Sequence, residues 1–357
     1  MKQPLGVAVV GVGRWGTNLL RAIGTIPAAR ITAVCDIDRQ RLEGAGRQLP
    51  GARQATDLGE LLGCADIDAV VIATPSDLHA AHATQALAGG RHVFVEKPMA
   101  TGYEDAQRLV ELARDRERKL MVGHILVHHP SVVALCDHVR RGKLGRIRRI
   151  ETCRLGAAQS TLDAWWTLAP HDLSVIRLLL GTPERLRLQG FGSPPEAQGA
   201  GGRRAHEPQT RQVARLEFAG GATASVTVGV RGRPKTRRIA VVGTRGTAVF
   251  DDTQELKLRI QDPSGGRVEV LPPLGPDQEP LVLEMARFVR GITDNADLGS
   301  DGDSGAEVVR LLETGTRSLE LGALWVSPTQ IESAAVDAEP PRKLAPQVVV
   351  QAASPLG

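Results

Sequence analysis

The chain has 357 residues, of which 42% are hydrophobic and 24% are charged. These fractions are those of an ordinary globular protein and exclude a chain that is disordered throughout. At about 150 residues per domain, the length predicts two or so domains that bury a core without disulfide bonds. No run of about 18 apolar residues occurs, so we expect no membrane-spanning helix, and the short apolar start does not read as a signal peptide.

Charge and cysteine content narrow the function classes further. The net charge is +4, but the basic residues are scattered and matched by 40 acids, and aromatic residues make up only 3%. Too few aromatics are present for base stacking, so we expect no nucleic-acid partner. No cysteine lies in a CxxC pair, which favours buried free thiols in a reducing cytoplasm and argues against a structural zinc site. The cysteines are Cys35, Cys64, Cys136 and Cys153.

The first third of the chain alternates short apolar runs with amphipathic stretches. The apolar runs predict strands at residues 6–10, 30–36, 69–73, 92–96 and 120–122. The stretches 78–88 and 104–118 carry apolar residues at helical spacing with charges on the opposite side. Strands that alternate with helices are typical of βαβ units and a parallel sheet.

The pattern then changes. Helices are expected at residues 131–141, at 170–180 with Pro170 in the first turn, and over 280–322 with a break near 293–303. Strands are expected at residues 147–154, 212–218, 222–230, 237–242, 247–251, 255–260 and 267–271. Their alternation and glycine-rich turns favour a large, open, mostly antiparallel sheet. Residues 193–208 are predicted to form a loop.

These patterns predict an α/β fold with two domains. Residues 1–124 would form the first domain, with the parallel sheet, and residues 125–326 the second, an α/β domain. Residues 327–357, rich in proline and alanine, would form a loosely structured tail.

A glycine-rich motif points to a dinucleotide. Gly11, Gly13 and Gly16 follow the first predicted strand and open a helix, with Arg14 and Trp15 between them. Such a turn lets the backbone approach a pyrophosphate at a helix N-terminus. Asp36 ends the next strand, where a carboxylate accepts from ribose hydroxyls and repels a 2′-phosphate, which favours NAD over NADP. Arg39 lies close by in sequence and would soften this preference.

Further polar residues end the predicted strands, at the edge where such sheets bind ligands. Thr74 and Pro75 follow the fourth strand, and His79 is either a cofactor contact or a packed histidine. Glu96 and Lys97 end the fifth strand, and Lys97 is either a solvated loop residue or a cation fixed near the reacting hydroxyl.

Three other groups of residues remain open at this point. His124 more plausibly borders the substrate cleft than joins His128 and His129 in a metal site, because the segment leaves a strand and a proline follows. We therefore expect no bound metal. Arg154 and the basic run at residues 231–238 are candidates to bind the phosphate groups of a substrate. The alternative is that they belong to a solvated hairpin with no ligand.

Several of these segments together resemble a known family. GVGRWG, ATPSDLH, EKPMA and TLAPHDLSVIRLLLG are similar to the Gfo/Idh/MocA family of NAD(P)-dependent sugar oxidoreductases, and the likeness runs from about residue 5 to residue 326. GKLGRIRRIETCRLG and RGRPKTRRIAVVGTRGTAVFDD resemble its branch acting on nucleotide-linked sugars, which includes UDP-sugar 3-dehydrogenases. The resemblance implies that the first domain, residues 1–124, is a Rossmann NAD-binding domain. It also implies that the second, residues 125–326, has an open sheet and serves substrate binding and oligomerisation, with dimers or tetramers formed through that sheet.

The resemblance also implies roles for individual residues. Lys97 would contact the substrate hydroxyl and the nicotinamide, and His171 would accept the hydroxyl proton. Asp172 would simply favour the positive end of its helix. The predicted cofactor contacts are Gly11, Gly13, Arg14, Trp15, Gly16, Asp36, Thr74, Pro75, His79, Glu96 and Lys97. The predicted substrate contacts are Lys97, His124, Arg154, Trp166 and His171.

One position departs from the family pattern. The family usually has an aspartate four residues before the histidine, and here Thr167 stands at that place. Threonine can hydrogen-bond a substrate or an imidazole but carries no charge. Either the enzyme tolerates Thr167 as a catalytic-site residue, or an acid such as Asp163 substitutes, or dehydrogenase activity is weakened or lost.

The sequence therefore predicts a cytoplasmic, NAD-dependent oxidoreductase that forms homodimers or homotetramers. Its predicted reaction is oxidation of a ring hydroxyl, at C3, of a nucleotide-activated hexose such as UDP-glucose. An aminotransferase would act next in an aminosugar-type pathway. The alternatives are a free sugar or cyclitol dehydrogenase of the inositol type, and a catalytically weak NAD-binding companion of a partner enzyme.

Overall fold

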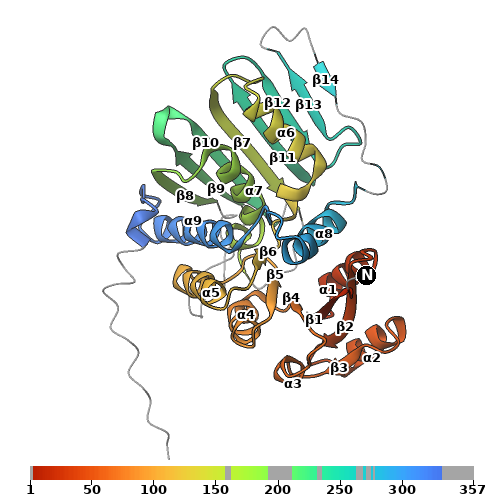
Figure 1. Ribbon diagram of the computed structural model, residues 1–357. Coiled ribbons are helices and arrows are strands. Elements are labelled where there is room, and N and C mark those ends of the chain that lie inside the picture. Colours follow the sequence, from red (N-terminus) through yellow and green to blue (C-terminus); the bar gives the residue numbers. More distant parts are fainter. Residues whose placement is uncertain are drawn as a thin grey trace, which may run out of the picture.

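The computed structural model describes residues 3–156, 162–191, 211–230, 235–262, 268–270, 275 and 278–331. The loop expected at residues 193–208 lies outside these ranges, as does most of the loosely structured tail expected at residues 327–357. Residues 327–331 of that expected tail are described, and Ile331 is buried in a core of the first sheet. Two sheets organise the described chain, one in each half, with helices between them (Figure 1). The predicted α/β class, with a parallel and a mostly antiparallel sheet, is confirmed.

The first sheet has six parallel strands in the order β3-β2-β1-β4-β5-β6. This is the Rossmann strand order, and the order reverses between β1 and β4. The carboxyl ends of these two strands meet at that point, which is where open α/β sheets bind ligands. The strands are β1 (Leu5–Val10), β2 (Ala29–Cys35), β3 (Arg53–Ala55), β4 (Ala69–Ile72), β5 (His92–Val95) and β6 (Leu120–Val122).

Helices cover both faces of this sheet because its strands are buried on both sides. Apolar residues of α1 (Arg14–Gly24), α2 (Arg39–Gln48) and α8 (Pro280–Thr293) share one core with the sheet. Those of α3 (Gly59–Leu62), α4 (His79–Ala88), α5 (Tyr103–Asp115) and α9 (Gly302–Glu320) share the core on the other face. Successive residues of a strand point to opposite faces, so Val9 belongs to the first core and Val10 to the second.

The second sheet has eight strands in the order β14-β13-β12-β11-β7-β10-β9-β8. Only the pair β7 and β10 is parallel, and the other neighbouring pairs are antiparallel. The strands are β7 (Ile147–Leu155), β8 (Arg185–Phe191), β9 (Arg211–Glu217), β10 (Thr223–Gly229), β11 (Thr236–Gly243), β12 (Thr247–Asp251), β13 (Leu258–Gln261) and β14 (Val268–Val270).

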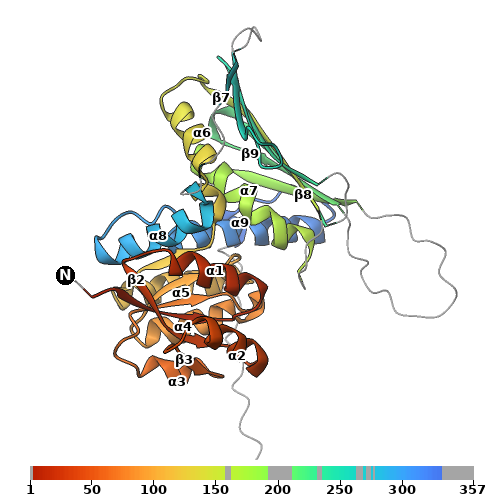
Figure 2. The ribbon, with the colours of Figure 1, turned by 90° about the vertical axis from the view of Figure 1, so that its right-hand side faces the viewer.

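Helices cover only one face of the second sheet. α6 (Pro130–Arg140), α7 (Ala164–Leu180) and α9 pack their apolar residues against it. Figure 2 shows the sheet nearly edge-on, with these helices on one side and no described helix on the other. Three short 3₁₀ turns complete the described elements: η1 (Ser76–Leu78), η2 (Ile125–His128) and η3 (Ala219–Gly221).

Helix α9 lies between the two sheets and belongs to both cores (Figure 2). Its Ala306 and Val309 pack with the first sheet, whereas Val308 and Leu312 pack with the second. At Gly315 the helix meets α7 so closely that an added Cβ would lie 2.6 Å from the Trp165 ring. The boundaries predicted at residues 124 and 326 remain a prediction, since the helices after residue 280 pack on both sheets.

Helix α7 corrects the sequence-based expectation for Pro170. The helix begins at Ala164, and the Asp163 side chain caps it by accepting a hydrogen bond from the Trp166 N–H. Pro170 therefore lies inside the helix and not in its first turn. An interior proline costs a hydrogen bond, and burial of the apolar side of α7 offsets that cost.

Several other elements differ from the prediction. Strand β13 begins only at Leu258, and β3, β8, α2 and α3 were not predicted. Cys35 and Cys136 are buried as expected, but Cys64 and Cys153 are only partly buried. Within the described residues, none of the helices combines the length and apolar character needed to cross a membrane.

Candidate active site

The glycine-rich turn has the backbone that a dinucleotide needs. Gly11 has φ +86°, and an added Cβ there would lie 2.7 Å from the backbone of Ala73. A Cβ on Gly16 would lie 1.8 Å from the Gly11 carbonyl oxygen. Gly13 caps α1 without any side-chain hydrogen bond, so the N–H groups of the first turn are available to a pyrophosphate. The turn thus fits the phosphate end of NAD.

Asp36 is held in place just after the end of β2. Its two carboxylate oxygens accept from the N–H groups of Val12 and Asp38, both at 2.9 Å. Each oxygen keeps a second lone pair, so the carboxylate can still accept from ribose hydroxyls. The arginine beside it is Arg41, with Nη1 3.8 Å from Asp36 Oδ2, and not the Arg39 that the sequence suggested.

His79 links two of the predicted cofactor-site segments. Its ring is 1% exposed, with Nδ1 2.7 Å from the Pro98 carbonyl oxygen and Nε2 2.9 Å from that of Thr74. Burial lowers its pKa, and the two carbonyl contacts oppose that effect. Both ring nitrogens face backbone carbonyls, and the single N–H of a neutral ring donates to one of them, so His79 lies between the segments that follow β4 and β5. Direct contact of His79, Thr74 and Pro75 with the cofactor remains a prediction.

Glu96 is locked beside the glycine-rich turn. Its Oε1 accepts from Trp15 Nε1 at 2.5 Å, and its Oε2 accepts from the Lys97 N–H at 3.2 Å. A Cβ on Gly123 would lie 2.9 Å from Oε1, so only glycine leaves room there. Burial raises the pKa of Glu96, and Lys97 opposes that rise. Trp15 and Glu96 therefore form one wall of the predicted cofactor site.

Lys97 and His171 lie at the same place. Lys97 Nζ donates to the backbone carbonyl of Thr167 at 3.0 Å, one helical turn before His171. Burial lowers the pKa of Lys97, and Glu96 opposes that shift. Burial also holds the pKa of His171 well below its usual value, with further lowering by Lys97 and Arg154. His171 is therefore a neutral imidazole at neutral pH, the form that accepts a proton.

Thr167 contributes through its backbone, which the sequence did not reveal. Its carbonyl oxygen receives Lys97, and its hydroxyl donates to the Leu162 carbonyl at 3.2 Å. Asp163 does not take the place of the missing aspartate, because it caps α7 and also accepts from Gln212 Nε2 at 3.1 Å. Eight residues of helix place its Cα about 12 Å along the axis from that of His171.

Arg154 is paired inside the protein. Its Nε and Nη2 donate to the two carboxylate oxygens of Asp172, both at 3.0 Å, and both residues are buried. Asp172 lies in the middle of α7, so the expectation that it favours the helix's positive end was wrong. Burial raises the pKa of Asp172 and Arg154 opposes that rise. Two nitrogens of the Arg154 guanidinium are thus already bonded to Asp172, and contact of Arg154 with substrate remains a prediction.

The indole of Trp166 points to α9. Its Nε1 donates to Thr316 Oγ1 at 2.9 Å, which fixes the two helices together. The residue is only partly buried, so this bond leaves some of its surface accessible. Contact of Trp166 with substrate remains a prediction.

A second arginine stands beside Arg154. Arg237 of β11 pairs in register with Arg154 of β7, so the two side chains lie on the same face of the sheet. Arg237 Nη1 is 3.2 Å from Asp252 Oδ2, and Lys257 Nζ is 3.1 Å from Oδ1. Within the basic run at residues 231–238, residues 231–234 lie outside the described ranges. The described part places one anchored arginine beside the Lys97–His171 pair.

Two buried groups near the site have no hydrogen-bond partner among the described residues. No sequence signal indicated Glu284, whereas His124 is the histidine predicted to border the substrate cleft. Glu284 of α8 is fully buried, and neither carboxylate oxygen has a hydrogen-bond partner within the described residues. Burial raises its pKa well above the usual value, and the nearby Glu96 adds to the rise. His124 is 1% exposed, and neither of its ring nitrogens has a partner among the residues described.

The described residues hold no group of three or more His, Cys, Asp or Glu side chains arranged for a metal ion. His124, His128 and His129 have separate surroundings. His128 Nε2 lies 3.0 Å from Ser300 Oγ, and His129 accepts from the Ser131 N–H.

Comparison with protein families decides what this arrangement belongs to. Residues 5–124 match the model of the oxidoreductase family with an NAD-binding Rossmann fold, GFO_IDH_MocA, and residues 132–249 match the GFO/IDH/MocA C-terminal domain. The chain belongs to the Gfo/Idh/MocA family. Its N-terminal half is that family's NAD-binding domain, and the cofactor predicted from the glycine-rich turn and Asp36 is confirmed as NAD.

Individual members of the Gfo/Idh/MocA family differ in their substrates. Inositol 2-dehydrogenase 2 of Saccharopolyspora erythraea is 31% identical over 50% of this chain and 54% of its own length. The dTDP-3,4-didehydro-2,6-dideoxy-alpha-D-glucose 3-reductase of Streptomyces violaceoruber is 28% identical over 83% of this chain and 89% of its own. The first curated relatives are matched over only about half of their length, 52% and 54%.

A solved structure extends the likeness to the fold of both halves. The UDP-N-acetylglucosamine 3-dehydrogenase of Acidithiobacillus ferrooxidans has a TM-score of 0.75 and 25% identity, over 88% of this chain and 96% of its own. Both Gfo/Idh/MocA domains are therefore present in the same arrangement.

Proposed function

We propose that this protein is an NAD-dependent oxidoreductase that oxidises a ring hydroxyl, at C3, of a nucleotide-activated hexose such as UDP-glucose. The observation that carries the proposal is the meeting of Lys97 Nζ with the Thr167 carbonyl, one turn from a neutral His171. A cation and a neutral base beside a dinucleotide turn are the groups that alcohol oxidation needs.

The residues divide the proton chemistry between them. His171 accepts the hydroxyl proton, since its lowered pKa keeps the imidazole neutral. Lys97 donates a hydrogen bond to the same oxygen and stabilises the negative charge that develops there. The Thr167 carbonyl and Glu96 hold Lys97 from its two ends, at Nζ and at the backbone N–H. Bound NAD would supply the hydride acceptor.

The cofactor would be held by the residues already described. The free N–H groups of α1 would face the pyrophosphate, and Asp36 would accept from the adenosine ribose. Arg14 and Trp15 begin α1 beside these groups, and Trp15 is bonded to Glu96. Trp15 and Lys97 would flank the nicotinamide.

Charge at the site supports a nucleotide sugar. Arg237 projects on the same sheet face as Arg154, and Lys257 lies beside it, so two cations share the single carboxylate of Asp252. The surplus positive charge suits a diphosphate bridge. The similarity to a dTDP-sugar 3-reductase and a UDP-sugar 3-dehydrogenase supports the same substrate class. An aminotransferase that consumes the 3-oxo product would follow.

The proposal includes the assembly and the compartment. The face of the second sheet that no described helix covers is the surface through which two or four copies would join (Figure 2). Four free cysteines suit a reducing cytoplasm.

Two other functions have support in specific observations. The similarity to an inositol 2-dehydrogenase favours a free cyclitol or sugar as the substrate. The Thr167 side chain, which brings no carboxylate to His171, favours a weakly catalytic NAD-binding companion of another enzyme.

The test is a panel of UDP- and dTDP-hexoses, free glucose and inositol, mixed with NAD while the reduced-nicotinamide absorbance is followed. We expect reduction with a UDP-hexose and none with the free sugars. Lys97→Ala and His171→Ala should abolish turnover but keep NAD binding. Lys119→Ala, which removes a partly buried lysine bonded to Asn295 away from the site, should change neither. Turnover of inositol alone, or full activity in Lys97→Ala, would overturn the proposal.

A further inference from the structure

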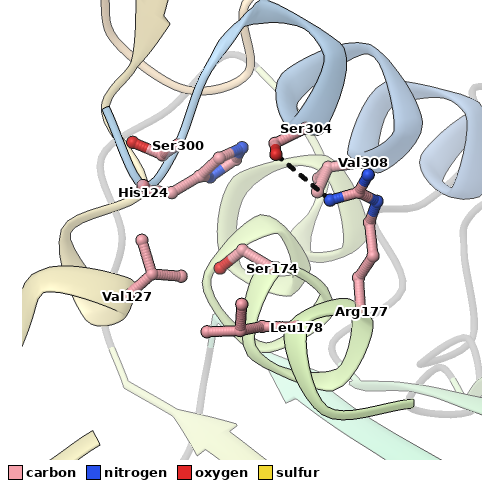
Figure 3. Close-up of a pocket in the computed structure, with 9 residues that line it drawn as sticks. His124, Val127, Ser174, Arg177, Leu178, Ser300, Ser304 and Val308 are labelled. Carbon is pink, nitrogen blue, oxygen red and sulfur yellow. Dashed lines mark hydrogen bonds between the residues drawn. The ribbon is translucent and has the colours of Figure 1, made fainter. Parts of the chain in front are cut away.

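A small cavity lies behind His124, away from the groups assigned to the reaction. Its volume is about 20 Å³, and it sits between η2, α7 and the first turn of α9. Figure 3 shows the polar side chains around it. These are His124, Ser174, Arg177, Ser300 and Ser304. The lining contains no carboxylate.

Two residues at the cavity, His124 and Arg177, have buried nitrogen atoms without a partner among the described residues. His124 is 1% exposed, and neither ring nitrogen has a hydrogen-bond partner among the described residues. Buried polar atoms are nearly always paired with protein or with a bound molecule. Burial, together with His128, Lys97 and Arg177, lowers the pKa of His124 to about 3. The ring is therefore neutral and offers one N–H donor to an occupant.

Arg177 is the charged group at the cavity. Its Nη1 donates to Ser304 Oγ at 3.2 Å, and its Nε is buried without a partner. No carboxylate in the described part of the chain forms an ion pair with it. A partly buried guanidinium that is not paired with an acid still has N–H groups that can donate to a carboxylate, and the planar guanidinium matches the planar carboxylate in shape.

The rest of the lining adds one donor, the hydroxyl of Ser304. Ser304 lies in the first turn of α9, where the backbone N–H groups carry partial positive charge. Asp301 caps this turn by accepting from the Ser304 N–H at 2.8 Å, which leaves the hydroxyl of Ser304 directed at Arg177. Ser174 and Ser300 also line the cavity (Figure 3), but their hydroxyls donate to the His171 and Val122 carbonyls and add no further donor.

We propose that this cavity binds the carboxylate group of a small anion. The Arg177 guanidinium, the His124 N–H and the Ser304 hydroxyl donate to the carboxylate. The volume is about that of one water molecule, so a single carboxylate oxygen enters the cavity. Leu178, 50% exposed, marks the side from which the remainder of the molecule projects. The cavity shares His124 with the predicted substrate contacts, whereas Arg177 and Ser304 have no part in the proposed reaction.

The position of the cavity links it to the reaction. Ser174 Oγ donates to the His171 carbonyl at 3.0 Å, one turn along α7. His124 also lies close enough to lower the pKa of His171.

Binding of sodium formate and sodium acetate to the full chain, measured by calorimetry at pH 7, tests the site without any substrate. We expect Arg177→Gln to weaken formate binding about tenfold or more, and Arg177→Lys to weaken it less, because a charge without the fork remains. Arg317→Gln is the matched control, since Arg317 lies on α9 with an exposed side chain bonded to Glu320. It should bind formate like the wild type.

A second measurement keeps the test valid if Arg177→Gln unfolds. In wild-type protein with ¹⁵N-labelled histidine, formate should shift the His124 ring resonances, assigned with His124→Gln. Absence of formate binding in the wild type, equal binding in Arg177→Gln, or chloride competing as strongly as acetate would each overturn the carboxylate site. A water molecule would then be the occupant.

Discussion

The buried pair of Arg154 and Asp172 gives the most direct test of the structure. Replacing Asp172 by alanine leaves a guanidinium that is nearly fully buried with no acid to receive its two hydrogen bonds. Removing one partner of a buried pair costs about 3–5 kcal/mol, because an uncompensated charge stays behind. We expect Asp172→Ala to lower the free energy of unfolding by about that amount.

The double variant separates pairing from packing. Arg154→Met with Asp172→Leu replaces both charges by apolar groups, which in other proteins is neutral or even stabilising by about 1–4 kcal/mol. We therefore expect the double variant to be more stable than Asp172→Ala alone. Urea denaturation followed by tryptophan fluorescence measures both, since Trp165 and Trp166 lie on the same helix as Asp172.

Two results would refute this reasoning. A loss below about 1 kcal/mol in Asp172→Ala would mean that water reaches Arg154 and that the pair is not buried. A double variant as unstable as the single one would mean that the site requires the charges themselves. If the double variant folds well but binds nucleotide sugar poorly, Arg154 also meets the substrate.

Further predictions concern charge at the site. Glu284→Gln should become more stable relative to the wild type as pH rises, by about 1.4 kcal/mol per pH unit above pH 4.5. The reason is that the carboxyl ionises in the unfolded wild type before it ionises in the folded one, where its pKa is raised, so the wild type loses stability. Thermal unfolding at several pH values measures this, and a difference independent of pH contradicts it. The pH profile of kcat/KM should keep its plateau at pH 6.5, where an ordinary imidazole is about half protonated, and fall only in more acid solution; an acid limb centred at 6.5 would speak against a depressed His171. Arg41→Ala should weaken NADPH binding about tenfold and NADH binding much less, since the guanidinium lies beside Asp36 where a 2′-phosphate would sit; fluorescence titration with both nucleotides decides, and equal losses would exclude that role. Trp15→Phe should loosen NADH by removing the bond that holds Glu96, with binding unchanged if the indole only covers the turn.

The Rossmann half follows from the sequence because its strands are buried on both faces. Such strands appear as short continuous apolar runs, and each predicted strand agrees with the structure within one residue at either end. Strand β3 is not predictable from the sequence because it has only three residues, two of them exposed, and so shows no apolar run. Strand β8 does alternate between polar and apolar residues, and its pattern was missed.

Contacts between residues far apart in the sequence limit how much of the site can be predicted. Gly11 and Asp36 were found because their spacing is local and tied to one motif. The pair Arg154–Asp172 joins a strand to a helix, and no spacing rule connects them. The bond from Lys97 to the Thr167 carbonyl is also hidden, because backbone oxygens occur at every position and only the fold selects one.

The order of elements along the chain has a consequence for synthesis. Helices α8 and α9 complete the two faces of the first sheet, yet both follow the whole of the second sheet in sequence. A ribosome releases the chain from its N-terminus, so the Rossmann strands emerge with part of each apolar face uncovered. That surface stays exposed until translation reaches residues 302–320, and α9 then closes both cores at once. Truncation before α9 should leave a chain that chaperones retain and that no added NAD rescues.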